Sequence, residues 1–244
     1  MALLEIRGVS KTFRSLKALD GVDIDVQAGT FHGLIGPNGS GKSTLLKAIA
    51  GAHFADSGTV TFDGRDITRA TPYERARAGL SLKFQITAVL PELSVYDNVL
   101  LAMQSTESLP RLLLSRSRRA LDAEVTGLLE RFRLVDRADD LAGELSHGQQ
   151  QWLEIAMALA LRPKLLLLDE PTGGMSPEER HVTGKLLEPI KAHCALIIVE
   201  HDLHFIRDIC DRLTVLDQGK VLDQGDVEAI QRSPKVQQVF TTRV

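Results

Sequence analysis

The chain has 244 residues, of which 43% are hydrophobic and 25% charged, and its formal net charge is −3. This composition is ordinary for a globular protein, and the length suffices for one large core or two modest ones. Because 32 Asp and Glu residues nearly balance 29 Lys and Arg residues, the charge argues against a basic nucleic-acid-binding surface and against an acidic disordered tail. We therefore expect no nucleic acid among the partners.

The cysteines and the apolar runs indicate the compartment. Cys194 and Cys210 lack the spacing of metal ligands, and so few thiols are typical of a reducing cytoplasm. The longest apolar candidates, residues 156–161 and 165–168, fall well short of the roughly 18 to 20 residues of a membrane span. Residues 1–8 lack the basic start and long apolar run of a secretion signal. The sequence thus predicts a protein that is made and kept in the cytoplasm.

The first third of the chain is rich in short strand patterns, each apolar or β-branched and ended by Gly or Asp. The predicted strands cover residues 3–9, 22–26, 31–35 and 59–62. A helix is predicted over residues 42–50, with Gly51 as its end.

From about residue 88 to residue 162 the pattern becomes helical, for instance over 121–132 and 149–161. Strand patterns then return, with helices between them. They cover residues 165–168, 196–199 and 213–216. Ser176, Pro177 and Glu179 form a good helix start with a capping box. Strands that alternate with helices predict a parallel α/β core, and the helical middle predicts an inserted subdomain.

A glycine-rich turn between the predicted strand 31–35 and the helix 42–50 matches the pattern G-x-x-x-x-G-K-[ST]. Its glycines let successive backbone N–H groups surround phosphate oxygens, and the helix directs its positive end at the same anion. Lys42 would place a full charge on the β- and γ-phosphates, and Ser43 would offer its hydroxyl to Mg²⁺. The predicted nucleotide-binding residues are Gly36, Pro37, Asn38, Gly39, Ser40, Gly41, Lys42, Ser43 and Thr44.

Two carboxylates, Asp169 and Glu170, follow the predicted apolar strand 165–168. Buried strands of a parallel sheet deliver such end residues to the ligand crevice. Asp169 is expected to hold Mg²⁺ through its water shell, and Glu170 to accept a proton from the attacking water. An acidic turn after a core strand is the alternative, which the phosphate-binding loop upstream disfavours.

The run Leu145-Ser146-His147-Gly148-Gln149 ends 20 residues before Asp169. It resembles the LSGGQ signature of ABC ATPases, with His147 in place of the first glycine. In that family the signature faces the γ-phosphate held by the opposite subunit, which implies a contact in trans for Ser146, His147, Gly148 and Gln149. An ordinary helix cap at Ser146 is the alternative. The position of the run between the two nucleotide motifs favours the ABC interpretation.

Three further residues match the same family. Gln85 is similar to the glutamine that reaches Mg²⁺ and the water, and His201 to the switch histidine that contacts the γ-phosphate. These matches imply that Glu170, His201 and Gln85 form the catalytic set, with Ser43, Gln85 and Asp169 at the metal. Phe13 occupies the position of the aromatic ring that stacks on adenine, although a Phe at a strand edge is also consistent with a core residue.

The resemblance covers about residues 3–239, and it is closest to the branched-chain amino acid uptake group. Residues 17–21, 64–68, 171–176 and 233–236 are similar to that group, and residues 145–154 to its urea and short-amide branch. His147 and Ser176 depart from the common pattern. His147 replaces a glycine, and Ser176 stands where many relatives have an aspartate. His147 adds bulk and a titratable donor beside the expected γ-phosphate.

The resemblance implies an α/β fold: a P-loop NTPase (RecA-like) core with an antiparallel β subdomain and an inserted α-helical subdomain. One ABC ATPase domain would span 1–244, with about 1–87 and 163–244 as catalytic core and about 88–162 as helical subdomain. Two molecules of ATP with Mg²⁺ are expected between two subunits arranged head to tail, in a homodimer or a heterodimer with a similar ATPase.

The implied partners lie at the membrane. A groove near residues 85–93 would hold a cytoplasmic helix of a transmembrane permease, and a periplasmic or extracellular solute-binding protein would take part indirectly. The protein would lie peripherally on the inner face of the membrane. The arginine-rich segment 104–119 is interpreted as a solvated surface connection, with a contact to lipid headgroups as the alternative.

Other functions remain as alternatives to uptake. An exporter ATPase, for example of lipopolysaccharide, has almost the same motifs. A non-transport ABC ATPase that acts on DNA or ribosomes would usually need a long coiled coil or a second cassette, and neither fits in 244 residues. A small-molecule P-loop kinase would lack the signature, Gln85 and His201.

Overall fold

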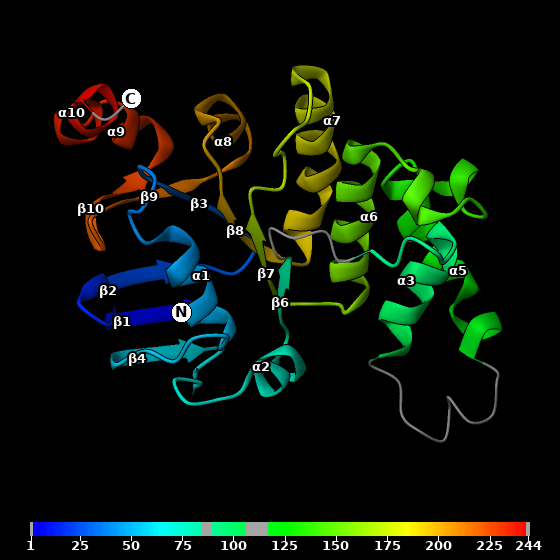
Figure 1. The fold of residues 1–244 in the computed structure, drawn as a ribbon, viewed down its shortest axis with the longest axis horizontal. Helices are drawn as coiled ribbons and strands as arrows, with labels where there is room; N and C mark the ends of the chain where they lie inside the picture. The colour runs from blue at the N-terminus through cyan, green and yellow to red at the C-terminus, as the bar shows by residue number, and fades with distance from the viewer. Residues whose placement is uncertain (1, 84–88, 106–116, 243–244) are drawn as a thin grey trace.

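A six-stranded sheet forms the centre of the computed structural model, which describes residues 2–83, 89–105 and 117–242 (Figure 1). Its strand order is β10-β9-β3-β8-β7-β6, and all neighbours are parallel except β10 and β9. The strands are β3 (Phe31–Ile35), β6 (Leu80–Lys83), β7 (Leu165–Asp169), β8 (Ala195–Val199), β9 (Arg212–Asp217) and β10 (Lys220–Asp226).

A second, antiparallel sheet has the order β2-β1-β4-β5. Its strands are β1 (Leu4–Phe13), β2 (Leu16–Val26), β4 (Ser57–Phe62) and β5 (Arg65–Asp66). Helix α1 (Lys42–Ala50) contacts both β2 of this sheet and β7 of the central sheet. One buried apolar cluster joins the two sheets through α1, so this helix is held on both sides.

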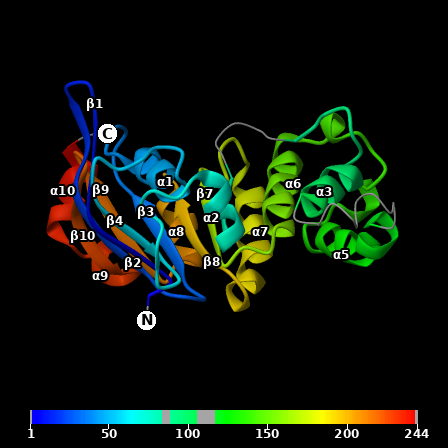
Figure 2. The same ribbon diagram turned by 90° about the horizontal axis from the view of Figure 1, so that it is seen from below.

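The remaining helices are α2 (Pro72–Ala78), α3 (Val95–Gln104), α5 (Ser117–Arg131), α6 (His147–Ala160), α7 (Pro177–Leu187), α8 (Leu203–Ile209), α9 (Val227–Gln231) and α10 (Pro234–Thr242), with short 3₁₀ turns at Val135–Arg137, Ala142–Glu144 and Glu188–Ala192. Most of them pack into the second buried cluster, on the face of the central sheet opposite α1, whereas α2 lies beside the end of α1. In two perpendicular views α3 and α5 lie at the end of the molecule opposite the antiparallel sheet (Figures 1 and 2).

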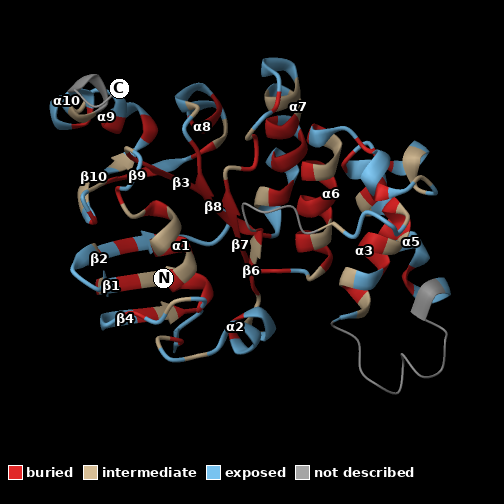
Figure 3. Cartoon of the chain, viewed as in Figure 1, coloured by how far each residue is buried: buried red, intermediate tan, exposed pale blue. Residues whose placement is uncertain are grey.

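The strands β3, β7 and β8 at the centre of the six-stranded sheet are buried along their whole length, as their largely apolar sequences require (Figure 3). In β7, Leu165 and Leu167 pack into the cluster around α1, whereas Leu166 and Leu168 pack into the cluster under the helices. This arrangement confirms the predicted α/β class with a parallel core and an antiparallel sheet. The helices α3, α5 and α6 fall inside the predicted range 88–162, and their separation as a subdomain stays a prediction.

Several elements were missed from the sequence. Strands β6 and β10 were not predicted, since β6 has four residues and β10 is polar and half exposed along its length. Helix α2 is short and polar, and a capping box between Thr71 and Glu74 starts it. Its buried Arg75 donates hydrogen bonds of 2.7 Å to the carbonyls of Ala48 and Ile49, which are end groups of α1.

Within the described residues, no helix combines the length and apolar character that a membrane crossing requires.

Candidate functional site

The phosphate-binding loop connects β3 to α1 in a backbone that excludes side chains. Gly41, the residue before α1, has φ +107°, and a Cβ there would lie 2.6 Å from the carbonyl oxygen of Ala18. A Cβ on Gly36 would lie 2.1 Å from the carbonyl oxygen of Leu216. Both glycines are therefore required by close packing as well as by conformation. No side chain caps the start of α1, which leaves its N–H groups to face a ligand.

Lys42 lies buried inside this loop. Its ammonium donates hydrogen bonds to the carbonyl oxygens of Gly36 at 2.8 Å and Pro37 at 3.0 Å. Burial lowers the pKa of Lys42, and the charges of Glu170 and Asp169 act in the opposite direction. The hydroxyl of Ser40 is also buried, and it has no hydrogen-bond partner among the described residues. The loop thus holds a cation and an unused polar group at the position predicted for the phosphates.

Ser43 and Asp169 supply oxygen atoms that fit a magnesium ion. Asp169 ends β7 with only 6% of its surface exposed, and it is hydrogen-bonded to Ser43. Burial raises the pKa of Asp169, and its Oδ1 atom has no hydrogen-bond partner in the described part of the chain. No described group of three or more His, Cys, Asp or Glu side chains could hold a metal unaided. Mg²⁺ commonly takes one or two protein oxygens and completes its shell with phosphates and water, so these residues suit it.

Glu170 and His201 meet because their strands are neighbours in the sheet. Asp169 in β7 pairs with Val199 in β8, which brings the residues that follow each strand together. The Nε2 atom of His201 lies 2.8 Å from Oε1 of Glu170. Both side chains remain partly exposed, so a ligand can reach them. The structure thus joins two predicted catalytic residues that are 31 positions apart.

A third group beside Glu170 and His201, the carboxylate of Glu200, was not predicted from the sequence. Its buried carboxylate accepts hydrogen bonds from the backbone and hydroxyl of Thr172 and from the backbone of His201. The only sequence feature that could have drawn attention to it is a carboxylate placed directly between an apolar strand and His201.

Phe13 is the last residue of β1 and is 39% exposed. Its ring makes an edge contact with His53, at 5.3 Å between centroids, and Lys11 lies over it at 5.6 Å. The paired strand β2 carries Ala18, whose carbonyl would meet a Cβ on Gly41, so this hairpin borders the phosphate-binding loop. An exposed ring is unlike a core residue, and stacking on adenine stays a prediction.

The signature run forms the start of α6. Ser146 and Gln149 make a capping box: each side chain accepts a hydrogen bond from the other residue's backbone N–H. The Nε2 atom of His147 lies 3.0 Å from the carbonyl oxygen of Gly173. A Cβ on Gly148 would come within 2.6 Å of Glu179. The signature therefore packs against the loop that follows Glu170 in the same chain, and its contact in trans stays a prediction.

Two sequence predictions concern residues outside the described parts of the chain. Gln85, predicted at the metal and in the catalytic set, lies in the undescribed range 84–88, and most of the arginine-rich segment lies in 106–116. Just before the first gap, the ammonium of Lys83 lies 3.0 Å from the carboxylate of Glu154 on α6. This buried ion pair connects the end of β6 to the helix that the signature begins.

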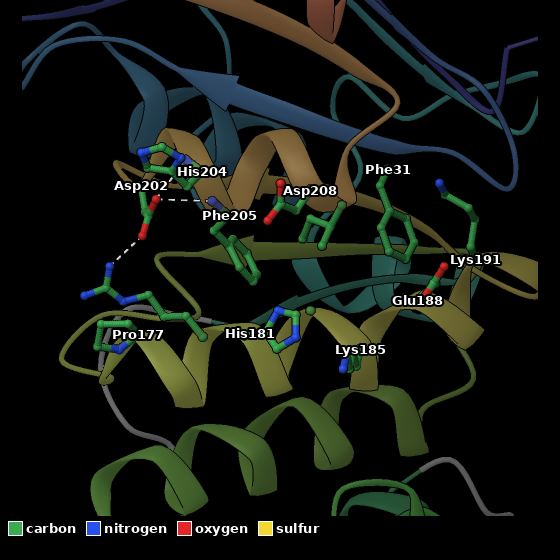
Figure 4. A pocket seen from close by; sticks show the side chains of 13 residues that line it. Phe31, Pro177, His181, Lys185, Glu188, Lys191, Asp202, His204, Phe205 and Asp208 are labelled. Carbon is green, nitrogen blue, oxygen red and sulfur yellow. Dashed lines mark hydrogen bonds and ion pairs between the residues drawn. The ribbon is translucent and has the colours of Figure 1, made fainter.

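A hollow of about 750 Å³ lies between α7 and α8, where Phe205 and Phe31 form part of its wall (Figure 4). Arg180 and Asp202, which form an ion pair at 2.5 Å, also line it. None of the predicted ATP-binding residues lines this hollow. The predicted phosphate- and metal-binding residues Lys42, Ser43 and Asp169 lie instead at an edge formed by the phosphate-binding loop and the end of β7.

Comparison with known proteins identifies the family. The ABC transporter family profile matches residues 19–173. The probable branched-chain amino acid transport ATP-binding protein LivG of Archaeoglobus fulgidus is 36% identical over 98% of this chain and 95% of its own length. The sulfate/thiosulfate import ATP-binding protein CysA 2 of Agrobacterium fabrum is 32% identical over 95% of this chain and 66% of its length.

Solved structures agree with this assignment. The ATP-binding cassette MJ1267 of an ABC transporter has a TM-score of 0.88 and 34% identity, with 98% of this chain and 99% of that chain covered. A dimeric post-hydrolysis state of the cassette MJ0796, bound to ADP and Pi, has a TM-score of 0.78 and 26% identity, with 92% and 98% covered. The chain therefore belongs to the ABC transporter family, and it is an ATPase of that family.

Proposed function

We propose that this ATPase powers the uptake of branched-chain amino acids, urea or short amides through a transmembrane permease. The observation that carries this proposal is the near full-length similarity to a LivG protein, together with the residues resembling the urea and short-amide branch. Relatives with ribose, sulfate or thiosulfate, and methionine import names are also similar, so import is better supported than any one solute.

In this proposal the chain binds one ATP at the edge described above. Phe13 stacks on adenine, and the phosphate-binding loop surrounds the phosphates, with the Lys42 ammonium opposite the β- and γ-oxygens. Ser43 and Asp169, with Gln85, hold Mg²⁺, which neutralises charge on the phosphates when bound. The hydrogen-bonded position of Lys42 supports this role, because its charge is already directed into the loop.

Glu170 accepts the proton of the attacking water, and His201 orients the γ-phosphate and the carboxylate of Glu170. The 2.8 Å contact between the two side chains supports this assignment, because it places a base and a donor within reach of one water. The site is completed by a second subunit, whose Ser146 and signature backbone face the γ-phosphate. The dimeric state of MJ0796, which is bound to ADP and Pi, supports a dimer by analogy.

The permease contact uses the groove near residues 85–93. Leu90 and Leu93, at its described end, are exposed apolar side chains, which suits a docked helix. The chain would lie in the cytoplasm against the inner face of the membrane, with the solute-binding protein on the other side. An exporter of lipopolysaccharide is the second candidate, and no feature of the described residues favours it.

The decisive experiment is purification with the native permease partners and reconstitution into vesicles. ATP-driven uptake of labelled leucine, urea and acetamide would then be measured, with the Glu170→Gln complex as the matched inactive control. We expect uptake of at least one solute by the parent complex alone. Robust ATP hydrolysis without uptake of any solute, or ATP-driven release of a lipid substrate, would contradict the proposal.

A further inference from the structure

Glu170 has a backbone conformation that must be held by its surroundings. Its φ of +50° lies in the left-handed region, which residues other than Gly, Asn and Asp rarely adopt. Such strain persists at functional sites where neighbouring contacts over-determine the local structure. The contacts that hold Glu170 therefore bear directly on where its carboxylate points.

Two backbone hydrogen bonds fix Glu170 itself. Its N–H donates to the carbonyl oxygen of Val199 at 2.9 Å, and its own carbonyl accepts from the N–H of Gly173 at 3.1 Å. The first bond continues the pairing of β7 with β8, and the second closes the turn that follows. The first bond ends on Val199, two residues before His201, so a direct connection from the turn to the His201 backbone needs a further contact.

That connection is made by Glu200, which is 5% exposed. Its Oε1 atom accepts from the N–H of Thr172 at 2.8 Å and from the Thr172 hydroxyl at 2.6 Å. Its Oε2 atom accepts from the N–H of His201 at 3.1 Å. One carboxylate thus joins the turn after Glu170 to the backbone of His201.

We infer that Glu200 is a positioning residue for ATP hydrolysis, because it fixes the turn after Glu170 and the backbone of His201 relative to each other. The inference rests on the proposed roles of Glu170 and His201, and it adds the group that keeps their side chains 2.8 Å apart. Hydrogen bonds to a charged acceptor are stronger than those to a neutral one. Both oxygens of a carboxylate accept, so it can accept from the two donors of Thr172 and from the N–H of His201 at once.

The amide of glutamine cannot replace this carboxylate without a conflict. In Glu200→Gln one oxygen becomes an NH₂ group, which would face either the two donors of Thr172 or the N–H of His201. The turn or the histidine must then move. A displacement of about 1 Å at a catalytic group can cost about 10²-fold in rate. ATP binding depends on the phosphate-binding loop, which Glu200 does not contact in the described structure, so it should persist.

The test compares kcat, KM and ATP affinity of Glu200→Gln with those of the parent protein and of Glu130→Gln. Glu130 is an exposed glutamate on α5 and controls for loss of one carboxylate. We expect kcat to fall about 10²-fold in Glu200→Gln, with ATP affinity by isothermal titration within threefold of the parent. Thr172→Val removes one of the three hydrogen bonds at constant shape and should lower kcat less, again at unchanged affinity. This second variant keeps the test valid if Glu200→Gln does not fold.

A double-mutant cycle with Glu170→Gln separates positioning from general stabilisation. If Glu200 acts through Glu170, then Glu200→Gln should cost little in the Glu170→Gln background, whereas independent effects would multiply. A near-parent kcat in both Glu200→Gln and Thr172→Val, or multiplicative losses in the cycle, would overturn the inference. A near-parent kcat in Glu170→Gln would instead overturn the proposed role of Glu170, so the two failures can be told apart.

Discussion

The buried ion pair between Lys83 and Glu154 allows a quantitative test of how β6 is joined to the signature helix. The two charged groups lie 3.0 Å apart, and each side chain is only 3% exposed. Lys83 ends β6 two positions before Gln85, and Glu154 lies in α6. The pair therefore links the segment predicted to reach the metal with the helix that begins at the signature.

Replacing Glu154 by Ala leaves the Lys83 ammonium buried without its ion-pair partner. Removing one member of a buried pair typically costs about 3–5 kcal/mol, because the remaining charge stays desolvated. For a chain of this size, 1 kcal/mol shifts the melting temperature by about 2–4 °C. We therefore expect Glu154→Ala to melt about 6–20 °C below the parent protein. Replacing both residues by apolar ones, Lys83→Met with Glu154→Leu, should recover most of that loss.

Urea and thermal unfolding of the nucleotide-free protein would measure these differences. Lys164→Ala serves as the control, because Lys164 pairs with Asp63 at 2.6 Å on the surface, where both side chains are more than half exposed. That variant should lose less than about 1 kcal/mol. The reasoning is refuted if Glu154→Ala also loses less than about 1 kcal/mol, or if the double apolar variant is as unstable as Glu154→Ala.

Three further outcomes are expected. Phe13→Ala should weaken ATP and GTP binding alike, by about 1–3 kcal/mol in isothermal titration, because stacking tolerates any purine; unchanged affinity with a lowered melting temperature would show that Phe13 is a core residue. Glu170→Gln should hydrolyse ATP about 10²–10⁴-fold more slowly while it still binds ATP, and it should accumulate as an ATP-bound dimer on size exclusion; a near-parent rate would exclude Glu170 as the base. Burial lowers the pKa of His32 to about 4, so the unfolded chain takes up the proton more readily, and stability should fall by about 3 kcal/mol as the pH drops from about 6.5 to 4. His32→Gln should flatten that pH dependence in urea unfolding, and an unchanged slope would show that His32 does not cause it.

The predictions that depended on local pattern agree best with the structure. Strand β7 and helix α1 were located within about one residue, because an apolar run and a glycine-rich turn can be recognised in the local sequence. Helix α7 begins at Pro177 with the predicted capping box of Ser176 and Glu179. Strand β10 was missed because its packing on β9, rather than its own composition, keeps it extended.

The parts of the site that depend on register could not be predicted from the sequence. The chain shows Asp169-Glu170 and Glu200-His201 as two separate acidic ends of strands. Only the pairing of β7 with β8 brings them together, and that pairing decides that Glu170 meets His201 while Glu200 reaches Thr172. The same limit applies to Lys83, whose partner lies 71 positions away in α6.

The contact of His147 with Gly173 restricts what the signature can donate. The carbonyl oxygen of Gly173 only accepts, so Nε2 of His147 carries the proton in their 3.0 Å hydrogen bond. A neutral imidazole then has an unprotonated Nδ1, which cannot donate to a phosphate. In this tautomer His147 has no N–H left for the γ-phosphate of a second subunit.

This geometry predicts that His147 contributes to hydrolysis through its hydrogen bond to Gly173. His147→Gly, which restores the family's usual residue, removes that bond, and Gly173 in turn donates to the carbonyl of Glu170, so hydrolysis should slow in this variant. Steady-state rates at saturating ATP would be compared, with His193→Gln as the control for loss of an exposed histidine elsewhere. Equal rates for the parent and His147→Gly would mean that the link from the signature to Gly173, and through the Gly173 N–H to the backbone of Glu170, does not contribute to hydrolysis.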